Sequence, residues 1–412
     1  MRVLFLIPFY APHRVGGAEL STELSARALA AAGHRVTVLT PNFASSQWKK
    51  EAQGKVTVLR FPFPLRFGPK LFAVFNSNLF HLLLARHARR AIRDTRAQLL
   101  HIQTAAFAPG GVRAAEAERI PAVVTLRDFG FAHNVSIDRE DAVGFQFSEA
   151  AYAASLAKRF RGPMAAALPL LYPSLRLNLA FRRRALKKAS ALVCVSEFLA
   201  AEAARSLGST RCVPIYHPAP PLKPAAARPI PGTLLFVGRL GELKGASLLL
   251  RALADASRQR PDLQLWLIGN SAIPRYRGLA ERLGIASRCH FLGSVPNHRL
   301  PHYYARAAAV VVPSVRAEPL SRVLIEASLL GKPVVATRAG GNPELIEQRK
   351  TGLLADPNPA ALSAAILELL SDRKLQARCA AALKKRAALF RPAAHARQLT
   401  KLYERVLKDA RR

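Results

Sequence analysis

The hydrophobic positions of the chain form short apolar runs separated by helical repeats. Residues 2–8, "RVLFLIP", have the pattern of a buried strand. Leu20, Leu24 and Ala28 then recur at helical spacing as far as Gly33, a residue type that commonly ends a helix, and a second apolar run, "HRVTVLT", follows. This opening predicts a strand–helix–strand unit.

Apolar runs of the same kind continue through the chain. The first half contains "KVTVLRF", "LLHIQ", "AVVTL" and "ALVCVS", and the second contains "TLLFVG", "LQLWLIG", "RCHFLG", "AAAVVVPS" and "PVVAT". Strands that are apolar on both faces are typical of parallel sheets covered by helices on each side. The pattern therefore predicts an α/β protein with doubly wound, Rossmann-like sheets.

A proline-rich passage interrupts this series near Pro214, and proline is unsuited to a helix interior or a central strand. A chain of 412 residues is also long enough for two cores. We expect an N-terminal domain over residues 1–218, a hinge over 219–231 and a second domain over 232–391. Two such domains would face each other across a cleft at the carboxyl ends of their strands, where ligands bind in this architecture.

Charge and cysteine content indicate the kind of partner and the cellular compartment. Sixty-two Lys and Arg against 26 Asp and Glu give a net charge of +36, which predicts an anionic neighbour: nucleic acid, an anionic membrane or a phosphorylated substrate. Four scattered cysteines suggest neither a zinc site nor a disulfide framework, and favour a reducing cytoplasm. The first apolar run is short for a secretory signal, and no uncharged run reaches the ~20 residues of a spanning helix.

A glycine-bearing loop with two cations follows the "TLLFVG" strand. In "FVGRLGELKGASLLL", Arg239 and Lys244 precede a predicted helix, whose N-terminal N–H groups would favour phosphate. Two cations there could neutralise a diphosphate leaving group. An ordinary solvated loop with surface cations is the alternative.

Two glutamates stand in "RAEPLSRVLIEASLLGKPVVAT". Glu318 follows a buried strand, so we expect it at the ligand edge, with Pro319 at the first position of the next helix. Glu326 lies within that apolar helix, where an unpaired carboxylate is costly to bury. It therefore needs a partner, either a ligand hydroxyl or the cation Arg322 one helical turn away.

These motifs in this order resemble the retaining glycosyltransferases of family 4, which have the GT-B fold. The resemblance rests on "GRLGELKG", the spacing of Glu318 and Glu326, "GKPVVAT", "GGNPELI" and the opening "GGAELSTELSARALAAAGHRVTVLT". It extends from Arg2 to about Leu370. It implies two Rossmann-like domains, with a terminal helix over about residues 392–412 that packs back on the first.

The resemblance also implies site roles. Arg239 and Lys244 would bind the nucleotide diphosphate, Glu326 the ribose, and Glu318 the hydroxyls of the transferred sugar. The backbone N–H groups of Gly16 and Gly17 would contact the diphosphate, and the backbone of Leu320 and Ser321 the sugar or distal phosphate. The loop around Gly293 to Val295 would flank the base.

The sequence departs from the family pattern in the first domain. Arg127 in "TLRDFGF" stands where a histidine near the sugar or acceptor is common, and Asp128 could hold it in place. Gln103 stands where a second histidine after His101 is usual. His101 is either an acceptor-side residue or a strand-end histidine satisfied by the backbone.

The implied chemistry is metal-independent hexosyl transfer with retention. The chain has no Asp-x-Asp sequence, so Arg239 and Lys244 would take the place of the metal clamp found in other glycosyltransferases, with Glu318 as the third predicted catalytic residue, on the sugar. No cofactor is expected, and the donor would be a UDP- or GDP-sugar. The resemblance implies a route in which the departing phosphate helps to deprotonate the acceptor.

Basic clusters flank apolar stretches, notably "LFAVFNSNLFHLLLA" beside "ARHARRAIRDTR". This combination is typical of an interfacial membrane surface, whereas no aromatic platform for nucleic acid is apparent. Solvated helix faces are the alternative. We therefore expect a cytoplasmic, peripheral enzyme at the inner membrane face that glycosylates a glycan or lipid-linked saccharide in polysaccharide, lipopolysaccharide or glycolipid synthesis. The alternative is a weakly active or inactive membrane- or glycan-binding member of the same fold.

Overall fold

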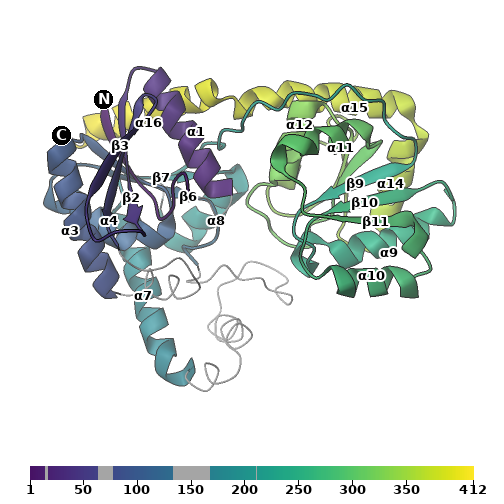
Figure 1. Ribbon diagram of the computed structural model, residues 1–412, viewed down its shortest axis with the longest axis horizontal. Helices are drawn as coiled ribbons and strands as arrows, with labels where there is room; N and C mark the ends of the chain where they lie inside the picture. Colours follow the sequence, from purple (N-terminus) through teal and green to yellow (C-terminus); the bar gives the residue numbers. More distant parts are fainter. Residues whose placement is uncertain (14–16, 64–77, 133–167, 210) are drawn as a thin grey trace. The chain divides into compact units, whose positions relative to one another are not determined.

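The computed structural model describes residues 1–13, 17–63, 78–132, 168–209 and 211–412. They form two compact units (Figure 1). The first comprises the described residues up to Ala219 together with Arg391–Arg412, and the second comprises Pro220–Phe390. No helix in these ranges is both long and apolar enough to cross a membrane.

The first unit is built on an eight-stranded sheet with the order β3-β4-β2-β1-β5-β6-β7-β8. All neighbouring strands are parallel except β3 and β4, which form an antiparallel pair. The strands are β1 Arg2–Leu6, β2 Arg35–Asn42, β3 Lys49–Gln53, β4 Val56–Pro62, β5 Leu99–Ile102, β6 Ala122–Leu126, β7 Ala191–Cys194 and β8 Cys212–Pro214. The helices are α1 Gly17–Ala31, α3 Asn78–Thr95, α4 Ala108–Ala117, α7 Leu168–Lys188, α8 Glu197–Leu207 and α16 Pro392–Asp409.

Alternating residues of the central strand β1 serve two cores. Leu4 and Leu6 pack with apolar residues of α3, α4, α7 and α8 on one face, whereas Val3 and Phe5 pack with α1 and α16 on the other. The terminal helix α16 thus belongs to the first unit, where it lies against α1. Figure 1 shows these two helix layers on opposite sides of the sheet.

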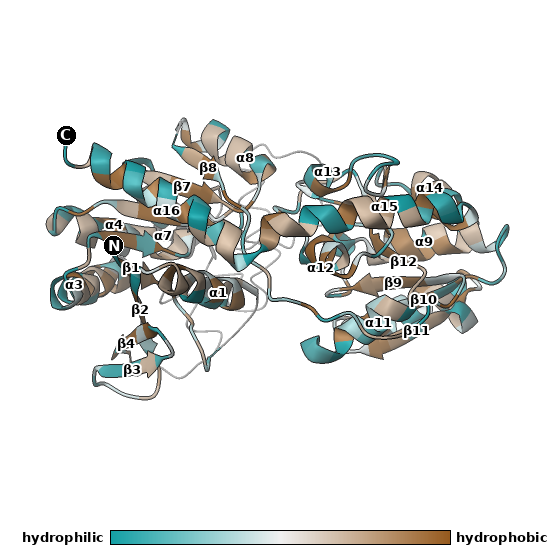
Figure 2. Cartoon of the chain, turned by 90° about the horizontal axis from the view of Figure 1, so that it is seen from above, coloured by the Kyte–Doolittle hydropathy of each residue, from teal (hydrophilic) through white to brown (hydrophobic). Residues whose placement is uncertain are grey.

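The second unit has six parallel strands in the order β11-β10-β9-β12-β13-β14. The strands are β9 Thr233–Val237, β10 Gln264–Ile268, β11 Cys289–Gly293, β12 Ala309–Val312, β13 Val334–Thr337 and β14 Leu353–Ala355. The helices are α9 Ala246–Ser257, α10 Ile273–Arg282, α11 Leu300–Arg306, α12 Arg322–Leu330, α13 Asn342–Leu345, α14 Pro359–Ser371 and α15 Arg373–Arg386. Figure 2 shows the apolar strands of this sheet between helices that carry hydrophilic residues.

The predicted fold class is confirmed: both units are α/β with parallel, Rossmann-like sheets. Both sheets also have a switch point, between β1 and β5 in the first and between β9 and β12 in the second. On either side of such a point the connections leave in opposite directions, which opens a crevice at the carboxyl ends of the strands. The two switch points therefore locate the edges where site residues are expected.

Candidate functional site

The second unit brings Lys244 and Glu318 together at its switch point. Lys244 lies in the turn Glu242–Lys244 after β9, and Glu318 lies in the loop after the neighbouring strand β12. The Lys244 Nζ donates to Glu318 Oε1, and Ser314 Oγ donates to Glu318 Oε2 at 2.9 Å. Each oxygen of the Glu318 carboxylate thus accepts one hydrogen bond from this unit. Arg239 is exposed in the same loop as Lys244.

Glycines hold these loops close to each other. A Cβ at Gly245 would collide with the carbonyl of Pro313, and a Cβ at Gly340 would collide with the backbone of Glu318. Gly341 N–H donates to the Glu318 carbonyl at 2.9 Å. Larger residues would push the cation loop and the glutamate loop apart. Steric contact with the neighbouring backbone therefore explains why glycine occupies these positions in "LKG" and "GGNPELI".

Glu326 is paired mainly with a residue that the sequence did not indicate. Tyr304 of α11 donates its hydroxyl to Glu326 Oε2 at 2.8 Å, whereas Arg322 approaches Oε1 only to 4.0 Å. Burial raises the pKa of the Glu326 carboxyl, and the Tyr304 hydrogen bond and Arg322 offset part of that rise. The remaining hydrogen-bonding capacity of this carboxylate suits a ligand hydroxyl.

The helix that carries Glu326 begins later than predicted. Pro319 does not occupy its first position: α12 starts at Arg322, with Ser321 as the preceding N-cap residue. The Glu318 carbonyl accepts from Gly341, and Gly341 also lies against the Pro319 carbonyl, so this segment is held in a non-helical course. Leu320 and Ser321 are buried as they lead into α12.

Two further residues that were predicted on the donor side lie along the same sheet edge. Gly293 ends β11 with φ +66°, and its carbonyl accepts from Gly269 N–H at 2.8 Å at the end of the adjacent strand β10. Val295 follows two residues later and is half-buried. In the other unit, Gly17 begins α1, and Gly16 lies outside the described residues.

In the first unit Arg127 is fixed at the carboxyl edge by Gln103 and Thr22. Its guanidinium donates to Gln103 Oε1 at 2.7 Å, to the Gln103 carbonyl at 3.2 Å and to Thr22 Oγ1 at 3.0 Å. Burial lowers the pKa of Arg127 to about 10, while the negative charge of Glu19 and Asp128 acts in the opposite direction. Arg127 remains a cation at neutral pH, positioned by two polar neighbours.

Asp128 was predicted to hold Arg127 in place, but the hydrogen bonds of Arg127 go to Gln103 and Thr22 instead. Asp128 is exposed, and its Oδ1 accepts from Gly130 N–H at 2.8 Å, so its described hydrogen bond closes its own turn. The carboxylate acts on Arg127 only through its charge. Gln103, which appeared only as a departure from the family pattern, is the actual partner.

His101 is a packing residue in this structure. It is 1% exposed, and its Nδ1 lies 2.5 Å from the Tyr403 hydroxyl of α16, while Nε2 lies 2.7 Å from Thr125 Oγ1. Burial and nearby Arg127 keep the pKa of His101 well below its usual value, so the ring is neutral. Both nitrogens are engaged within the unit, so the acceptor-side interpretation of His101 is corrected to a tie between β5, β6 and α16.

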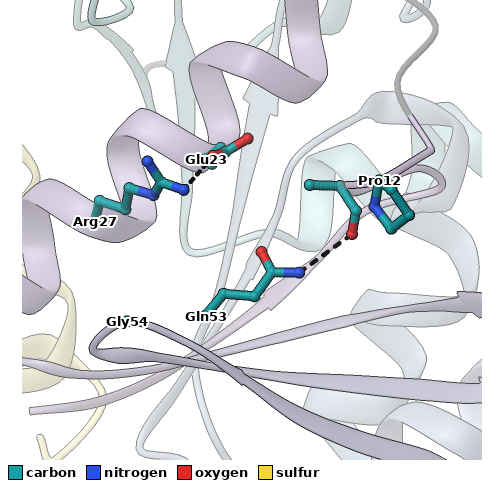
Figure 3. Close-up of a pocket in the computed structure, with 6 residues that line it drawn as sticks. Pro12, Glu23, Arg27, Gln53 and Gly54 are labelled. Carbon is teal, nitrogen blue, oxygen red and sulfur yellow. Dashed lines mark hydrogen bonds and ion pairs between the residues drawn. The ribbon is translucent and has the colours of Figure 1, made fainter.

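An open hollow of about 510 Å³ lies in the first unit beside α1 and the β3–β4 pair (Figure 3). Glu23 pairs with Arg27 at 2.6 Å at one side, and Gln53 donates to the Ala11 carbonyl at 3.3 Å at the other. None of the predicted site residues is among those that line it. Within the described part of the chain, no group of three His, Cys, Asp or Glu residues could hold a metal ion.

Two family models match the chain. The family model "Glycosyltransferase Family 4" matches residues 15–221, and "Glycosyl transferases group 1" matches residues 225–386. The chain is 38% identical over 178 residues to a D-inositol 3-phosphate glycosyltransferase of Corynebacterium jeikeium, a match that spans 41% of this chain and 42% of that protein.

Solved structures share the fold over the whole chain. A sucrose-phosphate synthase from Thermosynechococcus elongatus has a TM-score of 0.75 at 22% identity, with 99% of each chain covered. Anabaena HepE in complex with UDP-glucose has a TM-score of 0.67 at 22% identity, with 98% of this chain and 99% of HepE covered. The GT-B fold is therefore confirmed, and the chain belongs to glycosyltransferase family 4.

Proposed function

We propose that this protein is a retaining hexosyltransferase that uses a nucleotide-diphosphate sugar and needs no metal ion. The observation that carries the proposal is the ion pair of Lys244 with Glu318 at the switch point of the second unit. A cation and a carboxylate are adjacent there, at the sheet edge where nucleotides bind in this architecture, and we assign the carboxylate to the sugar hydroxyls. HepE, which shares the fold, binds UDP-glucose.

In this proposal Lys244 exchanges its partner during catalysis. Without ligand, Glu318 neutralises the ammonium group. A bound diphosphate would compete for Lys244 and Arg239, which would free one oxygen of Glu318 for the sugar hydroxyls, while Ser314 still orients the other. Positive charge would then stabilise the leaving phosphate as the glycosidic bond breaks. Glu326, oriented by Tyr304, would accept from the ribose.

We further propose that the acceptor is a glycan or lipid-linked saccharide of the cell envelope, as in polysaccharide or lipopolysaccharide synthesis, and that the protein works at the cytoplasmic face of the inner membrane. The high positive charge supports an anionic environment. Arg127, fixed at the carboxyl edge of the first unit, is suited to bind an acceptor that carries negative charge.

The test is hydrolysis or transfer with UDP- and GDP-sugars in the absence and presence of membrane extract, followed by anomer analysis of the product. Turnover that disappears in Glu318→Ala and in Lys244→Ala supports the enzyme. A correctly folded protein that binds nucleotide without turnover under any of these conditions supports the alternative, an inactive glycan-binding member. An inverted product would contradict retention.

A further inference from the structure

We infer that the outer faces of α3 and α7 form a docking surface for an anionic lipid bilayer. Of the eight large apolar side chains that are exposed in the described residues, five lie on these two helices. They are Leu79, Leu82 and Leu83 on α3 and Leu177 and Phe181 on α7, each between 44% and 69% exposed. Scattered single residues of this kind need no explanation, but a concentration on two helices that pack against the same third helix, α4, does.

The two helices lie in one layer of the first unit. Both contribute to the core on the same face of the sheet, and both pack against α4. Burial lowers the pKa of His81 on α3 to about 4, and the charge of Arg182 on α7 adds a smaller effect in the same direction, which indicates that these two residues of the two helices are near each other. The exposed residues therefore belong to one surface and not to two separate sites.

Apolar and basic positions follow the same order along both outer faces. On α3, Leu79, Leu82 and Leu83 precede the exposed Arg86, and the spacing of three or four residues keeps them on one stripe. On α7, Leu177 and Phe181 precede the exposed Arg184 and Lys187. The described ion pairs involve none of these three cations, so their charge is available to a partner.

Both helices also run in the same direction. Each leads directly into a strand of the parallel sheet, α3 into β5 and α7 into β7, so each begins near the carboxyl edge of the sheet. The apolar parts consequently lie toward the edge that carries Arg127, with the cations behind them. An apolar stripe bordered by Arg and Lys fits the boundary between acyl chains and anionic head groups.

Charge complementarity selects the occupant. A second copy of a chain with a net charge of +36 would repel this face, whereas phosphate head groups neutralise it. The exposed leucines of the two helices would contribute to membrane binding by burial among the acyl chains. This inference concerns where the proposed membrane enzyme attaches, and it can be tested without any glycosyl transfer.

The experiment is sedimentation of the full-length protein with vesicles of phosphatidylglycerol and phosphatidylcholine, compared with phosphatidylcholine alone. We expect preferential binding to the anionic vesicles that weakens with salt. Arg86→Glu with Arg184→Glu should lower the partition constant at least ~10-fold, because each cation near an anionic surface contributes about 1 kcal/mol. Leu82→Ser with Leu83→Ser should separately lower it at least ~10-fold, because the burial of two leucine side chains in the bilayer is lost.

Matched controls lie elsewhere on the chain. Leu389→Ser removes a leucine that is 38% exposed, and Lys374→Glu with Arg373→Glu makes the same change in net charge as the arginine variant. Both should bind as the wild type does. Binding that survives the α3 leucine substitutions, or that falls equally in the controls, overturns the inference. Dimerisation that is lost in Leu82→Ser with Leu83→Ser would assign the surface to a second copy instead. Vesicle binding without transferase activity would contradict only the proposed function.

Discussion

The hydroxyl of Tyr304 donates a 2.8 Å hydrogen bond to Glu326, and this contact joins α11 to α12 under the proposed ribose site. The tyrosine is completely buried, and burial together with the negative charge of Glu326 raises its pKa well above the usual value, so it stays a donor at all working pH values. Its role is to hold the carboxylate in a fixed orientation.

Removing this hydroxyl should shift the pH dependence of nucleotide binding. The Tyr304 hydrogen bond lowers the pKa of Glu326 against the effect of burial, so Tyr304→Phe should raise it further. A protonated Glu326 accepts fewer hydrogen bonds from the ribose, so UDP affinity should fall as pH decreases through this pKa. Calorimetric titration from pH 5 to pH 8 should show the decline at higher pH in Tyr304→Phe than in the wild type.

Tyr303→Phe is the control for that experiment, because Tyr303 packs edge-to-face against Trp266 and makes no described hydrogen bond to Glu326. It should keep the wild-type profile. Identical profiles for wild type and Tyr304→Phe would show that Glu326 does not act on the nucleotide.

Breaking the Lys244–Glu318 pair should affect activity much more than stability. The lysine side chain is 38% exposed, and pairs of this exposure contribute at most about 1 kcal/mol to folding. Lys244→Ala should lower kcat by roughly 10²-fold or more, because a cation aimed at developing phosphate charge is lost. Lys350→Ala, which breaks an exposed pair with Glu347, should leave kcat unchanged. A large loss of Tm in Lys244→Ala would assign the pair to folding instead.

Arg127 depends on Gln103 for a hydrogen-bond acceptor in a buried site. Gln103→Leu should lower the free energy of unfolding by about 2 kcal/mol, since a hydrogen bond to a charged group contributes about 1.5–3 kcal/mol. Urea unfolding of the single variants and of Gln103→Leu with Arg127→Met completes a double-mutant cycle. The double variant should be more stable than the sum of the single losses predicts, and strict additivity would mean that the two residues do not interact.

Acid should weaken the attachment of α16 through His395. This histidine bonds Ser25 of α1 at 2.9 Å and the Tyr216 carbonyl at 2.8 Å, and burial lowers its pKa to about 4. The imidazole binds a proton near pH 6.5 in the unfolded chain but only near pH 4 in the folded chain. The contribution of His395 to the free energy of unfolding is therefore fully present above pH 6.5 and decreases as pH falls toward 4.

The wild type should therefore lose about 2 kcal/mol from this residue between pH 7 and pH 5. His395→Gln should lose correspondingly less over the same interval in urea unfolding. His298→Gln, a substitution at an exposed histidine, should keep the wild-type dependence. Equal pH dependence in His395→Gln and wild type would mean that His395 is not the titrating group.

Chelation should not abolish activity. The sequence has no Asp-x-Asp motif, and in the proposed mechanism Arg239 and Lys244 neutralise the charge on the diphosphate. Turnover in EDTA should stay within about twofold of the untreated enzyme, since guanidinium and ammonium groups can supply the electrostatic stabilisation. A complete loss that is restored by Mn²⁺ would contradict metal independence.

Most of the fold could be predicted from the apolar runs of the sequence. Because strands in parallel sheets are buried on both faces, they are nearly continuous in hydrophobicity, and those of β1, β5, β9 and β12 could be located from the sequence. The short strand β3, "KKEAQ", was missed, because it is an exposed edge strand whose polar residues give no apolar signal.

The sequence also located the residues with site chemistry, since charges are conspicuous in apolar surroundings, as Glu318 and Glu326 are in "RAEPLSRVLIEASLL". Only the tertiary structure decided their partners. Lys244 is 74 positions from Glu318, Tyr304 is 22 from Glu326, and Gln103 is 24 from Arg127. Sheet order, which no local pattern encodes, makes β9 and β12 neighbours and so brings Lys244 to Glu318. Hydrogen bonding acts over about 3 Å in space, whatever the separation along the chain.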